Sequence, residues 1–336
     1  MKHLSRASLA LLIHACLCVP THLSAASIQA VPHSHGAAEP APIWQSTKAE
    51  HVDGFPDTKA HKKGTLTLST DALTFSGKSG TTSIQRDSVT AVSAGNERVE
   101  LWEMGGRILR MTIPDGGGLA VATFMHHRVD MLTIEFNDGR GGSHGAVFFL
   151  PANEADRALQ SFALTPIQPR SDSDSVCQSA AVEPNSVLVS TPGWDNAEVP
   201  AAYRALVYER MIERLRRTKA VGHVYRDGEN NAETACPQYV IHISISAFKE
   251  GSSVERAFLG PAGIFVGTTQ MTFDVTFTDT SGSPNTSLQI KATIRGDSES
   301  TDVAGLVAKS IVKHYANALR NADKSNSAKS TVKQAS

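Results

Sequence analysis

Apolar and polar residues alternate with period two along residues 58–165, which is the pattern of strands that bury one face. Turn sequences such as Gly105-Gly106 and Asn137-Asp138-Gly139 separate the alternating runs. The pattern therefore predicts several short antiparallel strands. Their apolar positions are Leu66, Leu68, Leu73, Phe75, Val99, Leu101, Leu109, Met111, Ile113, Leu132, Ile134, Phe136, Val147 and Phe149.

The period changes after Pro151, where Ala155, Leu159 and Phe162 recur at helical spacing. Short antiparallel strands followed by one helix predict a small antiparallel β-barrel or sandwich whose open end the helix covers.

Residues 187–321 have a different pattern. An amphipathic helix is expected at 200–218, with an apolar stripe opposite a row of arginines. Alternating runs at 239–246, 271–277 and 288–294 predict strands, and the last two form a hairpin with one buried face. A final helix begins near Ser300 or Thr301, either of which can cap it. The expected fold class is α+β, with this second antiparallel sheet covered by two helices. The first helix has its stripe at Val207, Tyr208, Met211, Ile212 and Leu215 and its arginines at Arg204, Arg210, Arg214 and Arg217; the last helix has Val303, Val307, Ile311 and Tyr315.

Three segments lack periodicity and are expected to be flexible. Residues 26–57 form a leader rich in Ala, Pro and His, residues 166–186 form a linker, and residues 322–336 form a polar tail. Two domains of ordinary size remain, at 58–165 and 187–321.

The N-terminus has the features of a secretory signal peptide over residues 1–25. Lys2 and Arg6 precede an apolar run at 7–19, and small residues follow at the expected cleavage site, Ala25 or Ala26. A lipidated Cys16 is a minor alternative. No other segment is apolar and long enough for a transmembrane helix, which needs ~20 residues. We expect an exported protein, periplasmic or extracellular.

Two cysteines, Cys177 and Cys236, remain after the signal peptide. In an oxidising compartment they permit one disulfide, although two unpaired buried thiols are the alternative. The formal net charge of the chain is −1, so no basic surface indicates nucleic-acid binding. No cofactor is expected.

The order of strands and one closing helix over residues 62–164 resembles the pleckstrin-homology and GRAM-like superfamily. The resemblance implies a small barrel. Members often bind lipids or proteins, and many are scaffolds only.

A second resemblance rests on Phe248-Lys249-Glu250-Gly251, Arg256, Gly260 and Gly263, followed by a long hairpin and a helix. Over residues 186–321 the chain resembles an uncharacterised bacterial envelope family. That family is similar to the soluble domain of the curli-secretion lipoprotein and to the N-terminal domain of the Tol-Pal translocation protein. The resemblance implies a role in binding or assembling envelope proteins.

Two patterns suggest catalysis or metal binding. Gly141-Gly142-Ser143-His144-Gly145 matches G-x-S-x-G, but a catalytic serine of that motif lies between a strand and a helix. Here the motif falls between two predicted strands, so we interpret it as a hairpin loop. His126, Asp130 and His144 have side chains that suit zinc, but we interpret residues 126–130 as a polar loop that leads into a strand at 131–136.

The leading hypothesis is a non-enzymatic binding or assembly protein of the cell envelope that acts through protein–protein contacts. The alternatives are a lipid or small-ligand carrier whose cavity is lined by residues such as Leu109, Met111 and Phe136, and, more remotely, a hydrolase that uses Ser143 or the His126/Asp130/His144 site. The partner-binding candidates of the leading hypothesis are Phe258, Leu259, Ile264, Phe265 and Val266 in a glycine-rich apolar segment, and His242 and Asp274 on the exposed sheet face.

Overall fold

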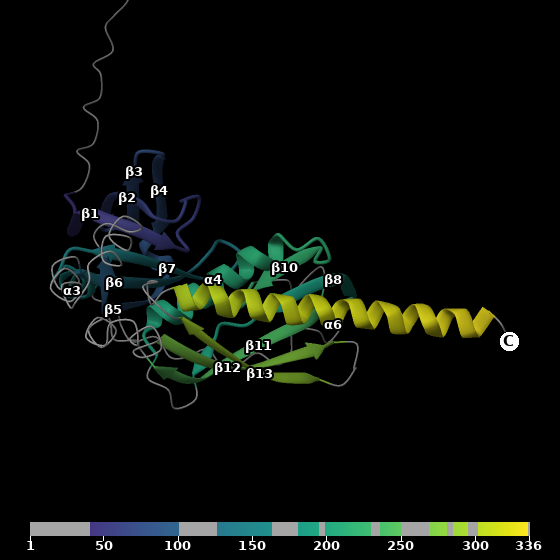
Figure 1. Ribbon diagram of the computed structural model, residues 1–336. Helices are drawn as coiled ribbons and strands as arrows, with labels where there is room; N and C mark the ends of the chain where they lie inside the picture. The colour runs from purple at the N-terminus through teal and green to yellow at the C-terminus, as the bar shows by residue number, and fades with distance from the viewer. Residues whose placement is uncertain are drawn as a thin grey trace, which may run out of the picture. The chain divides into compact units, whose positions relative to one another are not determined.

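The computed structural model describes residues 41–100, 126–162, 181–194, 199–229, 236–249, 269–280, 285–294 and 302–334. Pro40–Ser336 forms one compact unit. Its strands make two sheets, which we call sheet A, with seven strands, and sheet B, with six strands (Figure 1). The expected α+β class with mostly antiparallel sheets is confirmed.

Sheet A is antiparallel throughout, in the order β4-β3-β2-β1-β7-β6-β5. The predicted apolar residues whose side chains are described, including Leu66, Phe75 and Ile134, are buried in it; the side chain of Val99 is not among them. Residues 101–125, which contain several predicted strand positions, lie outside the described residues. The elements of this region are β1 (Trp44–Asp53), β2 (Lys62–Leu68), β3 (Ala72–Gly77), β4 (Gly80–Gln85), the 3-10 helix η1 (Arg86–Ser88), β5 (Val89–Glu100), β6 (His126–Asn137), β7 (Ser143–Leu150) and α3 (Ala155–Phe162).

The leader predicted at 26–57 is wrong in its last part, because β1 lies within it and pairs with both β2 and β7. Trp44, Ala49 and Val52 of β1 are buried. A register shift between Ser46 and Ala49 interrupts the alternation, since a bulge inserts an extra residue. The period-two pattern that identifies the other strands is therefore hidden here.

Helix α3 confirms the predicted change of period but not all of its buried positions. Ala155 and Phe162 are buried, whereas Leu159 is 41% exposed and Ala158 is buried instead. Positions i, i+3 and i+7 share one helix face, so a small residue faces the sheet and the larger leucine faces outward.

Sheet B is mixed, with the order β10-β8-β11-β12-β13 and β9 beside β11. The expected antiparallel hairpin of β12 and β13 is present, but β8 is parallel to both β10 and β11. Part of β8 lies in the predicted linker at 166–186, so that prediction is wrong for residues 182–186; residues 163–180 lie outside the described part. The strands are β8 (Val182–Val189), β9 (Gly193–Trp194), β10 (His223–Arg226), β11 (Cys236–Lys249), β12 (Thr269–Asp279) and β13 (Thr286–Ile294).

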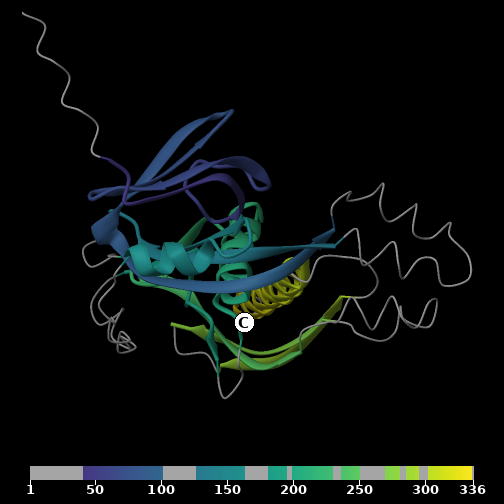
Figure 2. The ribbon, with the colours of Figure 1, turned by 90° about the vertical axis from the view of Figure 1, so that its left-hand side faces the viewer.

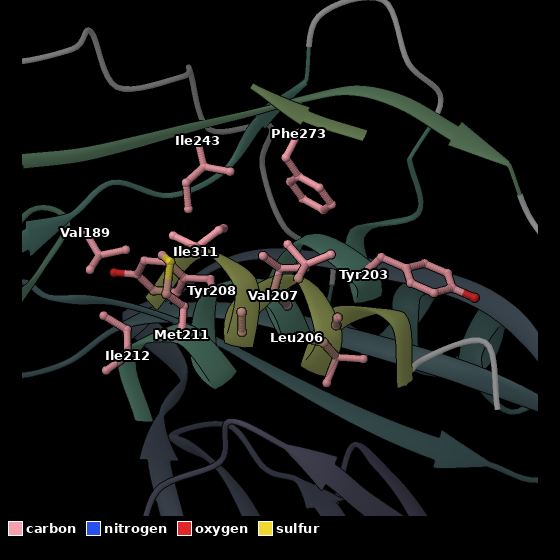
Figure 3. Close-up of a cluster of buried hydrophobic side chains, with 14 of the residues drawn as sticks. Val189, Tyr203, Leu206, Val207, Tyr208, Met211, Ile212, Ile243, Phe273 and Ile311 are labelled. Atoms are coloured by element: carbon pink, nitrogen blue, oxygen red, sulfur yellow. The ribbon is translucent and has the colours of Figure 1, made fainter. Parts of the chain in front are cut away.

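Helix α4 (Ala201–Arg216) is buried on opposite sides rather than along one stripe. It packs on β6 and β7 of sheet A and also against α6 (Asp302–Gln334), which in turn packs on β12 and β13 (Figure 2). One apolar cluster takes residues from both sheets, for example Phe149 of sheet A and Ile243 of sheet B. Figure 3 shows part of this cluster, with Leu206, Val207 and Met211 of α4.

Helix α6 buries Val303, Val307, Ile311 and Tyr315, as predicted. It continues to Gln334, so the flexible tail expected at 322–336 is wrong over most of its length. A helix that is already packed adds residues without a new nucleation cost, and this continuation needs no apolar periodicity. Among the described helices, none combines the length and the apolar character needed to cross a membrane.

Candidate functional site

His242 and Asp274 both lie on the side of sheet B that faces away from its buried residues. His242 is opposite Thr276, and Asp274 is opposite Ser244 on β11 and Gln289 on β13. The alternate residues, such as Ile243 and Phe273, are buried. We call this surface the open face; its side chains are His242, Ser244, Asp274, Thr276, Gln289 and Lys291.

The open face is polar and partly hydrogen-bonded within itself. His242, Asp274, Gln289 and Lys291 are exposed. The Gln289 Nε2 donates to Asp274 Oδ1 at 2.9 Å, and the His242 ring lies 3.2 Å from the Ser190 hydroxyl. The other partner-binding candidates, at 258–266, lie outside the described residues.

The expected β6–β7 hairpin is present, but its loop is shorter than predicted, because Ser143 is the first residue of β7. Ser143 is opposite Asn137 in the register, and its Oγ lies 3.5 Å from Asn137 Oδ1. Because neighbouring residues of a strand point to opposite faces, His144 does not face the Ser143 hydroxyl. The strand–turn–strand context is not that of a catalytic serine.

The structure separates the proposed zinc ligands. Asp130 is opposite Leu150, whereas His144 is opposite Phe136, so the two positions are six residues apart along β6, or about 20 Å. Instead, Asp130 Oδ2 accepts a hydrogen bond from the backbone N–H of Ala155 at 3.1 Å, and so caps α3. Within the described residues there is no group of three side chains placed to hold a metal ion; the side chain of His126 lies outside them.

Arg226 of β10 and Glu209 of α4 form a buried ion pair that no sequence pattern indicated. The Arg226 guanidinium donates to both carboxylate oxygens of Glu209, at 2.8 and 2.7 Å. The two side chains are only 5% and 7% exposed. Arg226 also donates to the Ser143 carbonyl at 2.9 Å, and Glu209 accepts from the Gly145 N–H at 3.0 Å. We call these four residues the Arg226 junction.

The charges of the Arg226 junction compensate one another. Burial would lower the pKa of Arg226, but its hydrogen bonds to Glu209 and the charge of that carboxylate raise it above its usual value. The guanidinium also lies over the Tyr208 ring, 5.5 Å from the centroid. His144, stacked on Phe136, has its pKa lowered by burial and by Arg226. The junction therefore holds the Arg226 guanidinium against the Glu209 carboxyl group.

Two further arginines of α4 face sheet A rather than solvent. Arg210 pairs with Asp53 at 3.3 Å, and Arg204 lies 3.7 Å from Glu135. Both arginine side chains are mostly buried. The arginine row of the amphipathic pattern thus forms part of the contact with sheet A at these two positions.

The sequence contains one signal that could have located this contact. Ala202, Ala205 and Glu209 lie at helical spacing next to the apolar stripe of α4, and small residues on a helix face permit close packing. Gly145 lies so near Ala205 that a Cβ added to the glycine would be 2.6 Å from the Ala205 Cβ. The partner Arg226 is 17 residues away from Glu209, and no local pattern links the two.

Phe136 and Cys236, two of the candidate residues, are both buried in the fold. Phe136, proposed to line a ligand cavity, is buried among aromatic rings and lies 6.5 Å from Phe55; Leu109 and Met111 lie outside the described residues. Cys236 is buried and disulfide-bonded. Because Cys177 lies outside the described residues, the pairing of these two cysteines stays a prediction.

No protein-family model matches the chain, and no curated protein matches it in sequence. Among solved structures, the PelC dodecamer from Paraburkholderia phytofirmans is 16% identical, with a TM-score of 0.27, and the match covers 39% of this chain and 87% of that one. A crystal structure of an uncharacterised protein is 9% identical, with a TM-score of 0.25, over 43% of this chain and 95% of that one. TM-scores this low do not establish a common fold, so nothing about the function of this chain follows from them.

Proposed function

We propose that this chain is an exported, non-catalytic protein of the cell envelope that binds or assembles other proteins through the open face of sheet B. The observation that carries the proposal is the separation of the two faces of that sheet. One face is apolar and packs on the helices, and the other presents the exposed side chains of His242, Asp274, Gln289 and Lys291 on three adjacent strands.

A rigid sheet face of this kind suits recognition of a folded protein. The side chains stand at fixed spacings on a hydrogen-bonded ladder, so a partner meets a preorganised pattern of donors and acceptors. Their chemistry is mixed, with a carboxylate at Asp274, an ammonium group at Lys291 and an imidazole at His242. Complementary charges on a partner would give specificity and speed association more than they would raise affinity.

The compartment is part of the same proposal. The signal-like residues 1–25 lie outside the described residues, but the disulfide at Cys236 supports an oxidising compartment. We also propose that sheet A with α3 is a PH/GRAM-like barrel, acting as a scaffold.

The proposal is tested by photocrosslinking from single positions in the native envelope. A photoreactive residue at Gln289 or Ser287 should trap one reproducible protein, and Asp274→Arg in the same chain should abolish the adduct. The matched control is the same probe at Thr81, an exposed strand position of sheet A. Equal adducts from all three positions, or an adduct that persists with Asp274→Arg, would exclude the open face as the binding surface. Mass spectrometry of the mature N-terminus tests export, with cleavage expected after Ala25 or Ala26.

A further inference from the structure

His51 is a buried histidine whose two ring nitrogens have fixed and opposite roles. Its side chain is fully buried in β1. Nδ1 lies 3.1 Å from the Lys59 carbonyl oxygen, which can only accept, so Nδ1 carries the proton. Nε2 lies 2.9 Å from the backbone nitrogen of Phe55, which donates to it, so Nε2 carries none. The fold therefore requires the neutral ring in one tautomer.

The segment held by these two bonds, residues 54–61, closes over an aromatic core. Phe55 is buried and packs with Phe75, Phe136 and Phe148 at centroid distances of 5.5–6.5 Å. The His51 ring itself lies against Phe75 and Phe148. Asp57 and His61 both have positive φ angles, of 50° and 56°, a strained conformation for residues other than glycine. The two hydrogen bonds of His51 therefore hold the segment in a backbone conformation that Asp57 and His61 disfavour.

We propose that His51 is an acid-sensitive latch, and that its protonation releases residues 54–61 and removes Phe55 from the aromatic core. An imidazolium carries a proton on both nitrogens. The new Nε2–H would point at the Phe55 N–H, so an attractive contact becomes a contact between two donors. Because the ring is buried among aromatic side chains, its charge would also lack solvation.

The charged groups around the ring do not offset this cost. β3 and β7 present the rings of Phe75 and Phe148 to it. On β2, Lys62 is the residue opposite His51 in the register, and its side chain is exposed. The carboxylate of Asp53 favours the protonated form, but it is also engaged by Arg210 at 3.3 Å and by the Gly54 N–H at 2.9 Å. His61, when charged, opposes the protonated form, and it is itself paired with Glu50. Burial, the largest effect, lowers the pKa of His51 and outweighs the backbone hydrogen bonds to Lys59 and Asp53, which raise it.

The direction of the pH effect follows from these facts. In the released segment His51 regains an ordinary pKa of about 6.5, whereas in the closed segment it is lower. Acid therefore favours the released form, and closure is lost as the pH falls below about 6.5. If the closed ring stays neutral over this range, the opening constant rises roughly tenfold between pH 7.5 and pH 5.5.

Hydrogen exchange of the full mature chain tests the latch. We expect the amides of 54–61, corrected for intrinsic rates, to open roughly tenfold more at pH 5.5 than at pH 7.5, while the amides of α6 keep their protection. His51→Gln keeps an acceptor but does not titrate, so it should lose this pH dependence. His61→Gln, the matched control, should retain it. The same pH dependence in the wild type and His51→Gln, or equal opening of α6, would overturn the proposal.

A second measurement needs no variant and applies if His51→Gln does not fold. Ring-nitrogen NMR of the wild type should show His51 as the Nδ1–H tautomer at pH 7.5. On acidification, protonation of the ring should coincide with loss of protection at the Phe55 amide. A ring that becomes protonated while the Phe55 amide stays protected would contradict the latch.

Discussion

Arg226 and Glu209 form a buried, bidentate ion pair that links β10 to α4. The same two side chains also hydrogen-bond to the backbone of β7 at Ser143 and Gly145. Sheet A is therefore attached to the rest of the unit by charged groups as well as by the shared apolar cluster. A buried charge without its partner is strongly destabilising, whereas a complete pair is often no better than apolar residues of the same size. Single and double replacements of this pair should therefore differ in their effect on stability.

Removing one member of the pair should be far more damaging than removing both. We expect Glu209→Ala to lower the free energy of unfolding by about 3–5 kcal/mol, because the Arg226 charge stays buried. Glu209→Leu combined with Arg226→Met should cost less than either single change, because no buried charge remains. Urea unfolding of the full chain measures both. Glu213→Ala, which breaks an exposed pair with Arg217, is the control and should change stability by less than ~1 kcal/mol. A double variant as unstable as the sum of its parts would contradict this account.

The close contact between Gly145 and Ala205 should not tolerate an added methyl group. Gly145→Ala would place its Cβ 2.6 Å from the Ala205 Cβ, and such overpacking costs about 1–3 kcal/mol. Ala205→Gly should partly rescue that variant, although glycine inside a helix itself costs about 1 kcal/mol. A double-mutant cycle by chemical unfolding measures the coupling. Gly139→Ala, which meets no atom within 4 Å, is the control with little expected effect. Strict additivity would show that the two residues do not touch.

Tyr315 carries a buried hydroxyl that has no hydrogen-bond partner among the described residues. The side chain is 1% exposed and packs against Tyr239 and Phe277. Because an unpaired buried polar group costs about 1–3 kcal/mol, we expect Tyr315→Phe to raise the thermal midpoint of unfolding. The matched control is Tyr208→Phe. The Tyr208 hydroxyl accepts from the Asp227 N–H at 3.0 Å, so this change should lower the midpoint. Destabilisation by Tyr315→Phe would mean that the hydroxyl is paired in solution.

Asp130 should act as a helix cap and not as a metal ligand. Asp130→Ala removes the acceptor of the Ala155 N–H at the start of α3, and loss of such a cap costs about 1 kcal/mol. Asp130→Asn keeps an acceptor and should restore most of the stability. Calorimetry with zinc or with a chelator should give the same unfolding midpoint in each case. A zinc-dependent midpoint that disappears with Asp130→Ala would instead support the metal site.

Several elements followed from local patterns alone. The alternation of Ile241, Ile243 and Ile245 correctly placed His242 on the outer side of β11, and the same holds for Asp274 between Phe273 and Val275. The period of α6 correctly predicted its buried stripe. These predictions succeed because side-chain direction in a regular strand or helix depends only on spacing. They fail at β1, where a bulge changes the spacing, and at Leu159, because Leu159 and Ala158 both lie at helical spacing from Ala155 and Phe162.

By itself, the sequence determined the α+β class, the polar side of sheet B, the hairpin at Ser143 and the apolar stripe of α6. Only the tertiary structure decided that α4 is buried on opposite sides, that Glu209 meets Arg226, and that His51 holds the backbone at Phe55 and Lys59. The physical reason is that spacing along the chain fixes where a side chain points, while its partner is fixed by packing between segments distant in sequence. Asp130 illustrates the limit: the sequence predicted a polar loop at 126–130, but these residues belong to β6, and the helix that Asp130 caps begins 25 residues later.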